Sequence, residues 1–415
     1  MKKLSLTFAL LGLSISLEAQ PSGFNYDEAK VPEYKLPDPL TTEDGKKVTT
    51  PKTWQDIRRP EIFSLFQKHV YGRSPKPSGK IHYQVFDDSL NTGNENYRRK
   101  QVEISLSGKK NGPKMDLLLY IPNKGTGPYP IFLTLNFRGN HSISKDPEVR
   151  ITRSWVPNEK GIKNNKASEA TRGMRSSRWD VSQITSRGYA LGTIYCGDIE
   201  PDHRNGRVDG IRAQYPEAYT WSAIGAWAWG LSRGLDYLEK DKDIDASKAI
   251  VMGHSRLGKT ALWAGASDTR FAITISNNSG CGGAALSRRR FGETVKRINT
   301  SFPHWFVDQY KTYNDNEDAC PVDQHQLAAL VAPRPLYIAS AVQDRWADPR
   351  GEFLAAKHAA PVYELLGAGT FPTKDIPPVD KPVQGAIGYH IRSGKHDVTT
   401  FDWKAYLDFA DKHFN

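Results

Sequence analysis

Cysteine is scarce in this sequence, which has three in 415 residues: Cys196, Cys281 and Cys320. They allow one disulfide at most and leave one thiol over, and we expect Cys281 to pair with Cys320. The sequence has no C-x-x-C, no H-E-x-x-H and no other His/Cys spacing typical of a zinc site. It therefore gives no support to a metal-dependent mechanism, and no cofactor is implied.

Long apolar runs are also lacking. A helix that spans a bilayer needs about 20 apolar residues, and no run in this sequence reaches that length. The uncharged run at residues 4–17 follows two lysines and precedes Glu-Ala-Gln at 18–20. This pattern is typical of a cleavable secretory signal. We expect a signal peptide at residues 1–19 and a single catalytic domain at residues 20–415. The mature protein should be secreted or periplasmic and should not associate with the membrane.

Acidic residues are fewer than basic ones, 46 Asp and Glu against 57 Lys and Arg, which gives a formal net charge of +11. A basic surface attracts acidic partners over long range, so charge alone admits nucleic acid, anionic lipid and polysaccharides with uronic acids. Secretion favours the polysaccharide over nucleic acid. The same charges are equally compatible with a solvated surface that serves only solubility. We expect a monomer.

Short apolar runs alternate with helical patterns along most of the chain. Residues 130–135 and 190–195 are continuous apolar runs, typical of strands buried on both faces of a parallel sheet. Residues 221–238 have apolar side chains at helical spacing. Further strands are expected at 81–86, 102–106, 115–121, 248–252, 335–341 and 388–392, the first three antiparallel at one edge, and further helices near residues 54, 260 and 400. The alternation predicts an α/β fold with a mostly parallel central sheet between two helical layers.

Two segments lack such periodicity. Residues 21–51 are rich in Pro, Lys, Asp and Thr, and we expect an extended arm over the surface, which carries no obvious chemistry. Residues 141–179 are polar and longer than a simple connection, and loops of that length are usually functional or disordered. We expect the second segment to shape a substrate cleft.

The sequence G-H-S-R-L-G-K at residues 253–259 lies between an expected strand and an expected helix. A nucleophile elbow has this order of strand, tight turn and helix, with flanking glycines because side chains there would clash. Ser255 stands in the nucleophile's place, although the second glycine comes one place later than in the usual G-x-S-x-G. The alternative is a serine that only caps the helix.

A serine nucleophile needs a base and an acid that orients the base. His396 follows the last expected strand and is the preferred base, with His390 in that strand as the weaker candidate. Asp344 follows the strand at 335–341 and is the expected acid, whereas Asp348 is expected to cap or brace the loop. The order Ser, acid, His along the chain is that of the α/β-hydrolase fold.

The oxyanion of such a reaction needs hydrogen-bond donors. Arg256 directly follows the serine, so its backbone N–H should face the oxyanion, and loss of one such donor typically costs roughly 3 kcal/mol. The N–H of Phe137, just after the strand at 130–135, is the expected second donor.

These residues resemble the glucuronoyl esterases of carbohydrate esterase family 15, whose nucleophile motif is similar to G-H-S-R-L-G-K. The likeness runs from about residue 130 onward, through S-G-C-G-G at 279–283, R-R-R-F-G-E at 288–293, P-H-W-F at 303–306, Q-D-R-W-A-D-P at 343–349, G-Y-H at 388–390 and H-D-V at 396–398. In that family the serine attacks the ester between a glucuronic acid of xylan and a lignin alcohol. The resemblance implies a secreted glucuronoyl esterase whose partners are glucuronoxylan and lignin-carbohydrate esters.

The resemblance also implies roles for individual residues. Arg256 matches an arginine whose side chain, with its backbone, stabilises the oxyanion. Lys259, Glu293 and Trp346 match residues that contact sugar hydroxyls. Lys and Glu can hydrogen-bond vicinal hydroxyls, and an indole offers a flat face and one N–H donor. The alternatives from the residues alone are a surface ion pair and a core tryptophan.

One position departs from many members of that family, the fungal ones especially. Their triad acid is a glutamate that aligns with Asn278 here, and an asparagine cannot supply the carboxylate. Some bacterial members use an aspartate after the later strand, a pattern that Asp344 fits.

Two other functions are compatible with parts of this pattern. An acetyl or feruloyl xylan esterase would have the same triad, and Lys259, Glu293 and Trp346 are what favour the glucuronoyl substrate. An inactive carbohydrate-binding protein on the same fold would normally have a broken triad, whereas here every triad position is filled.

Overall fold

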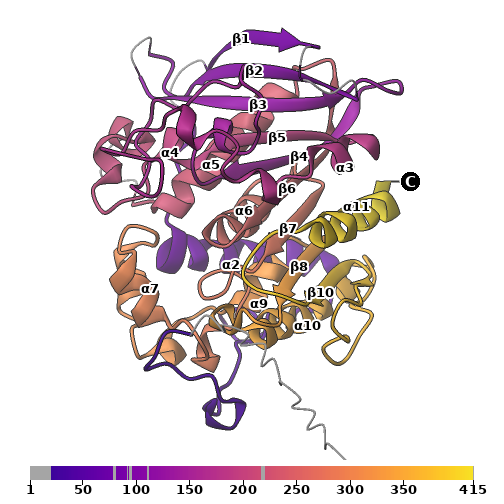
Figure 1. Cartoon of the computed structure of the whole chain (residues 1–415). Helices are drawn as coiled ribbons and strands as arrows, with labels where there is room; N and C mark the ends of the chain where they lie inside the picture. Colours follow the sequence, from indigo (N-terminus) through magenta and orange to yellow (C-terminus); the bar gives the residue numbers. More distant parts are fainter. Residues whose placement is uncertain are drawn as a thin grey trace, which may run out of the picture.

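The strands of this protein form one sheet. The computed structural model describes residues 20–77, 81–90, 92, 96–109, 112–215 and 220–414, so the expected signal peptide lies outside the described residues. In the described part the sheet is ten-stranded, in the order β1-β2-β3-β5-β4-β6-β7-β8-β10-β9 (Figure 1). The strands are β1 (His82–Ser89), β2 (Tyr97–Ser105), β3 (Lys114–Pro122), β4 (Tyr129–Asn136), β5 (Ala190–Tyr195), β6 (Ile244–His254), β7 (Ile273–Asn277), β8 (Leu336–Ala341), β9 (Val383–Gln384) and β10 (Ile387–Arg392).

The centre of the sheet is parallel, from β5 through β4, β6, β7 and β8 to β10. Strands β1, β2 and β3 are antiparallel at one edge, as expected, and β9 is antiparallel at the other. Parallel strands end at the same edge of a sheet, and ligands of such sheets bind outside those carboxyl ends. The loops after β6, β7, β8 and β10 therefore meet at one edge.

Alternate residues of the central strands pack into two cores, one on each face of the sheet. In β3, Leu117 and Leu119 belong to one core and Leu118 and Tyr120 to the other. The first core is covered by α2 (Arg59–Phe66), α5 (Ala223–Leu238), α6 (Arg256–Ser267), α9 (Gln324–Ala329) and α10 (Pro349–Leu365), and the second by α3 (Val181–Ser186) and α11 (Thr400–Phe414) (Figure 1). The expected three-layer α/β arrangement is confirmed.

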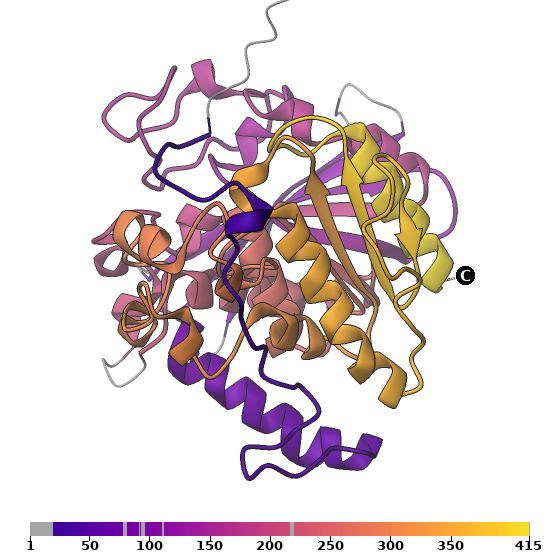
Figure 2. The ribbon, with the colours of Figure 1, turned by 90° about the horizontal axis from the view of Figure 1, so that it is seen from below.

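The remaining helices are short. They are α1 (Pro51–Thr53), α4 (Cys196–Ile199), α7 (Val295–Ser301) and α8 (Asp308–Lys311), with 3-10 turns between them. Residues 51–71 form one continuous helical stretch, because a π-helical turn at Trp54–Arg58 joins α1 to α2 and a second one, at Gln67–Tyr71, extends α2. The arm that precedes this stretch runs beside α10, as the indigo segment of Figure 2 shows. No helix of the described residues is long and apolar enough to cross a membrane.

Two strands, β7 and the two-residue β9, and one covalent link differ from expectation. Strand β7 is fully buried but was not expected, because three of its five residues are polar and hide the apolar run. The expected disulfide between Cys281 and Cys320 is wrong, since both cysteines and Cys196 are free and buried. Burial raises the pKa of the Cys196 and Cys320 thiols to about 12, so these thiols act as small core side chains.

Candidate active site

Ser255 lies on a strained turn between β6 and α6, with φ of +57° and ψ of −131°. A Cβ on Gly253 would lie 1.9 Å from the carbonyl oxygen of Leu257, and one on Gly258 would lie 3.0 Å from the Cβ of Ser279. The second glycine thus stands three places after the serine, where a side chain would also lie 3.1 Å from the carbonyl oxygen of Asn277 at the end of β7. The Ser255 side chain makes no capping hydrogen bond to the described residues of α6, which argues against a simple helix cap.

The loops after β8 and β10 bring Asp344 and His396 together. Nδ1 of His396 lies 2.6 Å from Oδ2 of Asp344. The Asp344 side chain is buried, whereas 42% of the His396 side chain is exposed. Burial alone would raise the pKa of the Asp344 carboxyl, but the hydrogen bond and charge of His396 hold it below its ordinary value. A carboxylate in this position keeps Nδ1 protonated and leaves Nε2 available as a base.

Asn278, which the resemblance aligns with a glutamate, contacts the same carboxylate. Its Nδ2 donates a hydrogen bond to Oδ2 of Asp344 at 2.8 Å. Its backbone is left-handed, with φ of +46°, a conformation that asparagine tolerates better than most residues. The amide also lowers the pKa of Asp344, so this position assists the acid instead of supplying it.

Arg256 begins α6, where backbone N–H groups have no partner within the helix. Its guanidinium forms an ion pair with Asp202 at 2.6 Å and lies 4.5 Å from the ring centre of Phe137. Asp202 also accepts hydrogen bonds from His304 and Trp305. Burial would raise the pKa of Asp202, but Arg256 and these two donors lower it to about 2. Asp202 was not expected from the sequence, and its position shortly after β5 is the one signal that could have suggested it.

His390 and Asp348, the two residues that the sequence placed outside the triad, have structural tasks. His390 is buried in β10 and hydrogen-bonds Asp402. Asp348 caps α10 by accepting from the N–H of Gly351, and it pairs with Arg289 at 2.8 Å. Both predictions from the sequence are confirmed.

A cavity of about 820 Å³ opens at this edge of the sheet. Its walls include Ser255, Arg256, Lys259, Asn278, Glu293, Phe302, Trp305, Asp344, Trp346 and His396. Seven of the residues that the sequence singled out therefore share one cavity, whereas Phe137, the expected second oxyanion donor, lines a separate small pocket beside His254. In the described part of the chain, no group of three His, Cys, Asp or Glu side chains could hold a metal ion.

The polar walls of the cavity are fixed by backbone contacts. Nζ of Lys259 donates a hydrogen bond to the carbonyl oxygen of Ser279. The N–H of Glu293 donates to the carbonyl oxygen of Trp346 at 3.0 Å. Burial raises the pKa of the Glu293 carboxyl, and the positive charge of Lys259 opposes that shift.

Comparison with known proteins decides the family. A family model described as glucuronyl esterase of fungi matches residues 204–367. A solved structure of a promiscuous CE15 esterase from the marine bacterial metagenome is 54% identical, with a TM-score of 0.89 over 94% of this chain and 100% of that one. A glucuronoyl esterase from Solibacter usitatus is 47% identical, with a TM-score of 0.88 over 93% and 100% of the two chains. The 4-O-methyl-glucuronoyl methylesterase 1 of Wolfiporia cocos is 30% identical over 83% of this chain and 74% of its own.

The chain belongs to the glucuronoyl esterases of carbohydrate esterase family 15. The resemblance seen in the sequence and the α/β-hydrolase fold are thereby confirmed. The predicted class of enzyme, a carboxylic ester hydrolase, is confirmed as well.

The N-terminal arm of this glucuronoyl esterase reaches the cavity, although its sequence carries no obvious chemistry. Gln20 and Pro21 belong to the cavity walls, and Nε2 of Gln20 donates a hydrogen bond to the carbonyl oxygen of Gln343 at 2.9 Å. The ring of Phe24 meets that of Trp346 edge-on, with centroids 4.8 Å apart. An arm without periodic pattern gives no hint of where it packs.

The polar loop at residues 141–179 does not line the cavity as expected, since none of the described wall residues comes from it. It instead contacts the loop of the base from outside, because Nε of Arg178 lies 2.5 Å from Oδ1 of Asp397. Its backbone is largely irregular, with 3-10 turns at Glu169–Thr171 and Ser176–Arg178.

Proposed function

We propose that this protein hydrolyses esters of glucuronic acid and of 4-O-methylglucuronic acid, with Ser255, His396 and Asp344 as catalytic triad. The observation that carries the proposal is a single cavity lined by these three residues and by Lys259 and Glu293. Its wall residues suit both an acyl transfer and the hydroxyls of a uronic acid.

The proposed reaction has two steps. Oγ of Ser255 attacks the ester carbonyl while His396 takes its proton and then passes that proton to the leaving alcohol. Asp344 orients His396 and stabilises its charged form. Water, activated by His396, then hydrolyses the acyl-enzyme and releases the uronic acid.

The negative oxygen of both tetrahedral intermediates needs donors. We propose the N–H of Arg256, at the positive end of α6, and the N–H of Phe137 for this task. The guanidinium of Arg256 lines the cavity and adds positive charge. Its ion pair with Asp202 limits where that charge can move.

We propose that Lys259, Glu293 and Trp346 bind the sugar hydroxyls. Nζ of Lys259 uses one donor on the carbonyl oxygen of Ser279, and an ammonium has three. Two donors therefore remain for substrate. Glu293 can accept from a hydroxyl, and the indole of Trp346 offers a face or an N–H.

The proposed natural substrates are esters that join glucuronoxylan to alcohols of lignin. Phe302 and Trp305 support an aromatic alcohol, because both line the cavity and their rings stack with centroids 3.8 Å apart. A flat aromatic wall favours an aromatic leaving group over a small aliphatic one.

The decisive experiment compares benzyl glucuronate with acetylated xylan. Wild type, Ser255→Ala and Ser186→Ala are assayed under identical conditions, where Ser186 is an exposed serine at the end of α3 and serves as matched control. We expect wild type and the control to release benzyl alcohol and Ser255→Ala to lose this activity.

Other outcomes are equally informative. Release of acetate alone would favour an acetyl xylan esterase and would refute the glucuronoyl substrate. If Ser255→Ala keeps both activities, the proposed triad is refuted. If wild type hydrolyses neither ester, a binding protein is favoured.

We also propose that residues 20–415 form one catalytic domain that is exported after loss of residues 1–19 and acts as a monomer. The exposed large apolar side chains are scattered over separate segments, which is usual for a monomer. Sequencing the N-terminus of the exported protein and light scattering test these points; an intact N-terminus or a dimer mass would contradict them.

A further inference from the structure

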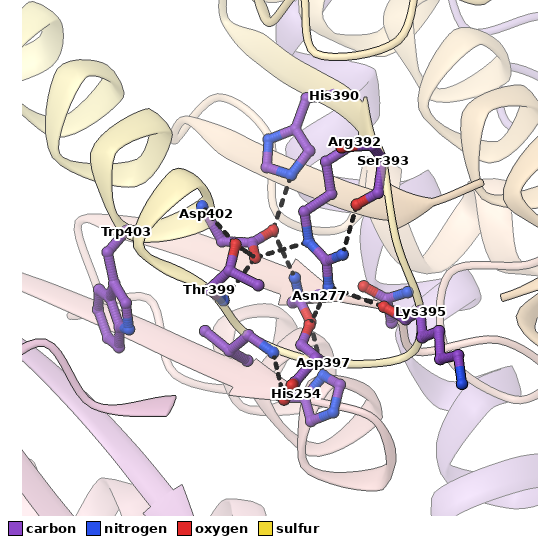
Figure 3. Close-up of polar contacts among 12 residues, drawn as sticks. His254, Asn277, His390, Arg392, Ser393, Lys395, Asp397, Thr399, Asp402 and Trp403 are labelled. Carbon is purple, nitrogen blue, oxygen red and sulfur yellow. Dashed lines mark hydrogen bonds and ion pairs between the residues drawn. The ribbon is translucent and has the colours of Figure 1, made fainter. Parts of the chain in front are cut away.

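A buried carboxylate, Asp402 at the start of α11, lies within a network of polar contacts with residues of β7, β10 and the loop after β10 (Figure 3). Its Oδ2 accepts hydrogen bonds from Nε of Arg392 at 2.8 Å and from the N–H and hydroxyl of Thr399, both at 2.7 Å. Its Oδ1 accepts from Nε2 of His390 at 2.9 Å and from Nδ2 of Asn277 at 3.2 Å. Five donors surround one carboxylate, so its position is strongly fixed.

Arg392 connects this carboxylate to the loop that carries the candidate base. Its Nη2 donates to the carbonyl oxygen of Lys395 at 3.0 Å and to that of Asp397 at 2.6 Å, and its Nη1 donates to that of Ser393 at 2.9 Å. Lys395 and Asp397 are the neighbours of His396 on either side. The guanidinium, 3% exposed, thus holds the backbone on both sides of the base.

The same carboxylate also reaches the nucleophile elbow through Asn277. Because Nδ2 of Asn277 donates to Asp402, its Oδ1 is the acceptor that faces Nδ1 of His254, 2.6 Å away. The carbonyl oxygen of Asn277 accepts from the N–H of Ser255 at 2.9 Å. The ring of His254 lies beside that of His396, with centroids 4.4 Å apart.

The imidazole of His254, which lies beside the candidate base His396, is neutral. Burial, followed by the charge of His396, lowers the pKa of His254 well below its ordinary value. A neutral neighbour does not repel the imidazolium that forms on His396 during the reaction. The buried ion pair of Asp402 with Arg392 thus supports both the turn that carries Ser255 and the loop that carries His396.

We propose that Arg392 and Asp402 are positioning residues that hold His396 at working distance from Ser255. The proposal rests on the proposed triad. The His396 side chain is 42% exposed and stands on an irregular loop, so the backbone on its two sides decides where the ring lies. A misplacement of about 1 Å can cost about 100-fold in rate.

The first test is Arg392→Lys, which keeps the charge but loses the planar fork that reaches Asp402 and the loop carbonyls together. Wild type, this variant and Ser255→Ala are assayed on benzyl glucuronate, with inhibition by free glucuronate measured beside it. We expect kcat to fall by about 100-fold, with KM and the inhibition constant of glucuronate within about threefold, because the sugar-binding residues Lys259 and Glu293 make no contact with Arg392.

The matched control is Arg334→Lys. Arg334 is a half-buried arginine that likewise donates to backbone carbonyl oxygens, those of Gly265 at 2.6 Å and Phe271 at 2.8 Å. It precedes β8 and so lies at the opposite edge of the sheet from the cavity. We expect a comparable drop in Tm for both variants and a loss of kcat in Arg392→Lys alone.

Thr399→Val is the second variant, for the case that Arg392→Lys does not fold. It removes only one hydroxyl donor to Asp402, and we expect kcat to fall severalfold at unchanged KM. Wild-type kcat in a folded Arg392→Lys, or in Thr399→Val, would overturn the proposal, as would an equal loss of kcat in Arg334→Lys. Activity that survives in Ser255→Ala would instead refute the triad, so the two failures are distinguishable.

Discussion

The amide of Asn278 gives the sharpest test of how the acid of the triad is tuned. Its Nδ2 lies 2.8 Å from Oδ2 of Asp344, the same oxygen that faces His396. A hydrogen bond to a charged group contributes about 1.5 to 3 kcal/mol, and one pKa unit corresponds to about 1.4 kcal/mol. Removal of the amide should therefore shift the titration of this pair by about 1 to 2 units.

The direction of the shift follows from charge. Without the amide, Asp344 is less stable as an anion and binds its own proton more tightly, and it also holds the imidazolium of His396 more strongly. Both effects favour the protonated form of the Asp344–His396 pair. The acid limb of the profile of kcat/KM against pH should move upward by about 1 to 2 units.

The variant for this test is Asn278→Gly, because glycine keeps the backbone φ of +46° without strain. Asn278→Asp is the companion, since it places a second carboxylate beside Asp344 and should shift the acid limb further. Asn164→Gly is the control: Asn164 is exposed and has a φ of +53°. An acid limb that stays in place in both Asn278 variants would refute this account of the acid.

Two more predictions follow from charged residues near the cavity. Asp202→Asn should lower the free energy of unfolding by about 2 kcal/mol at pH 7. Because the pKa of Asp202 is lowered to about 2 in the folded protein, this loss should shrink below about pH 4 and nearly vanish by about pH 2; urea unfolding at several pH values checks it, and a pH-independent loss would contradict it. Lys259→Met should lower kcat/KM for benzyl glucuronate about 10- to 100-fold, since a charged hydrogen bond is lost, but should leave hydrolysis of phenyl acetate, which has no sugar hydroxyls, within about threefold. Equal losses on both esters would argue against a sugar contact.

The parts of this enzyme that depend on neighbours along the chain could be predicted from sequence. Strand β5 has the expected bounds and α11 begins where expected, because their apolar periodicity is local. The turn around Ser255 was also predictable, since a side chain at Gly253 would collide with a carbonyl oxygen four residues away. The order of Ser255, Asp344 and His396 then needed only the rule that parallel strands end at one edge.

Only the tertiary structure decided which distant segments meet at that edge. The arm at Gln20, the ion pair of Asp202 with Arg256, and the three free cysteines have no periodic signal. The same holds for the link from Asp402 through Arg392 to the loop of the base. The sequence by itself determined most of the strands and helices and the candidate residues of the site, because helix and strand periods act over short range. The supporting contacts join residues far apart in sequence, and they exist only after the packing of the sheet has brought those residues together.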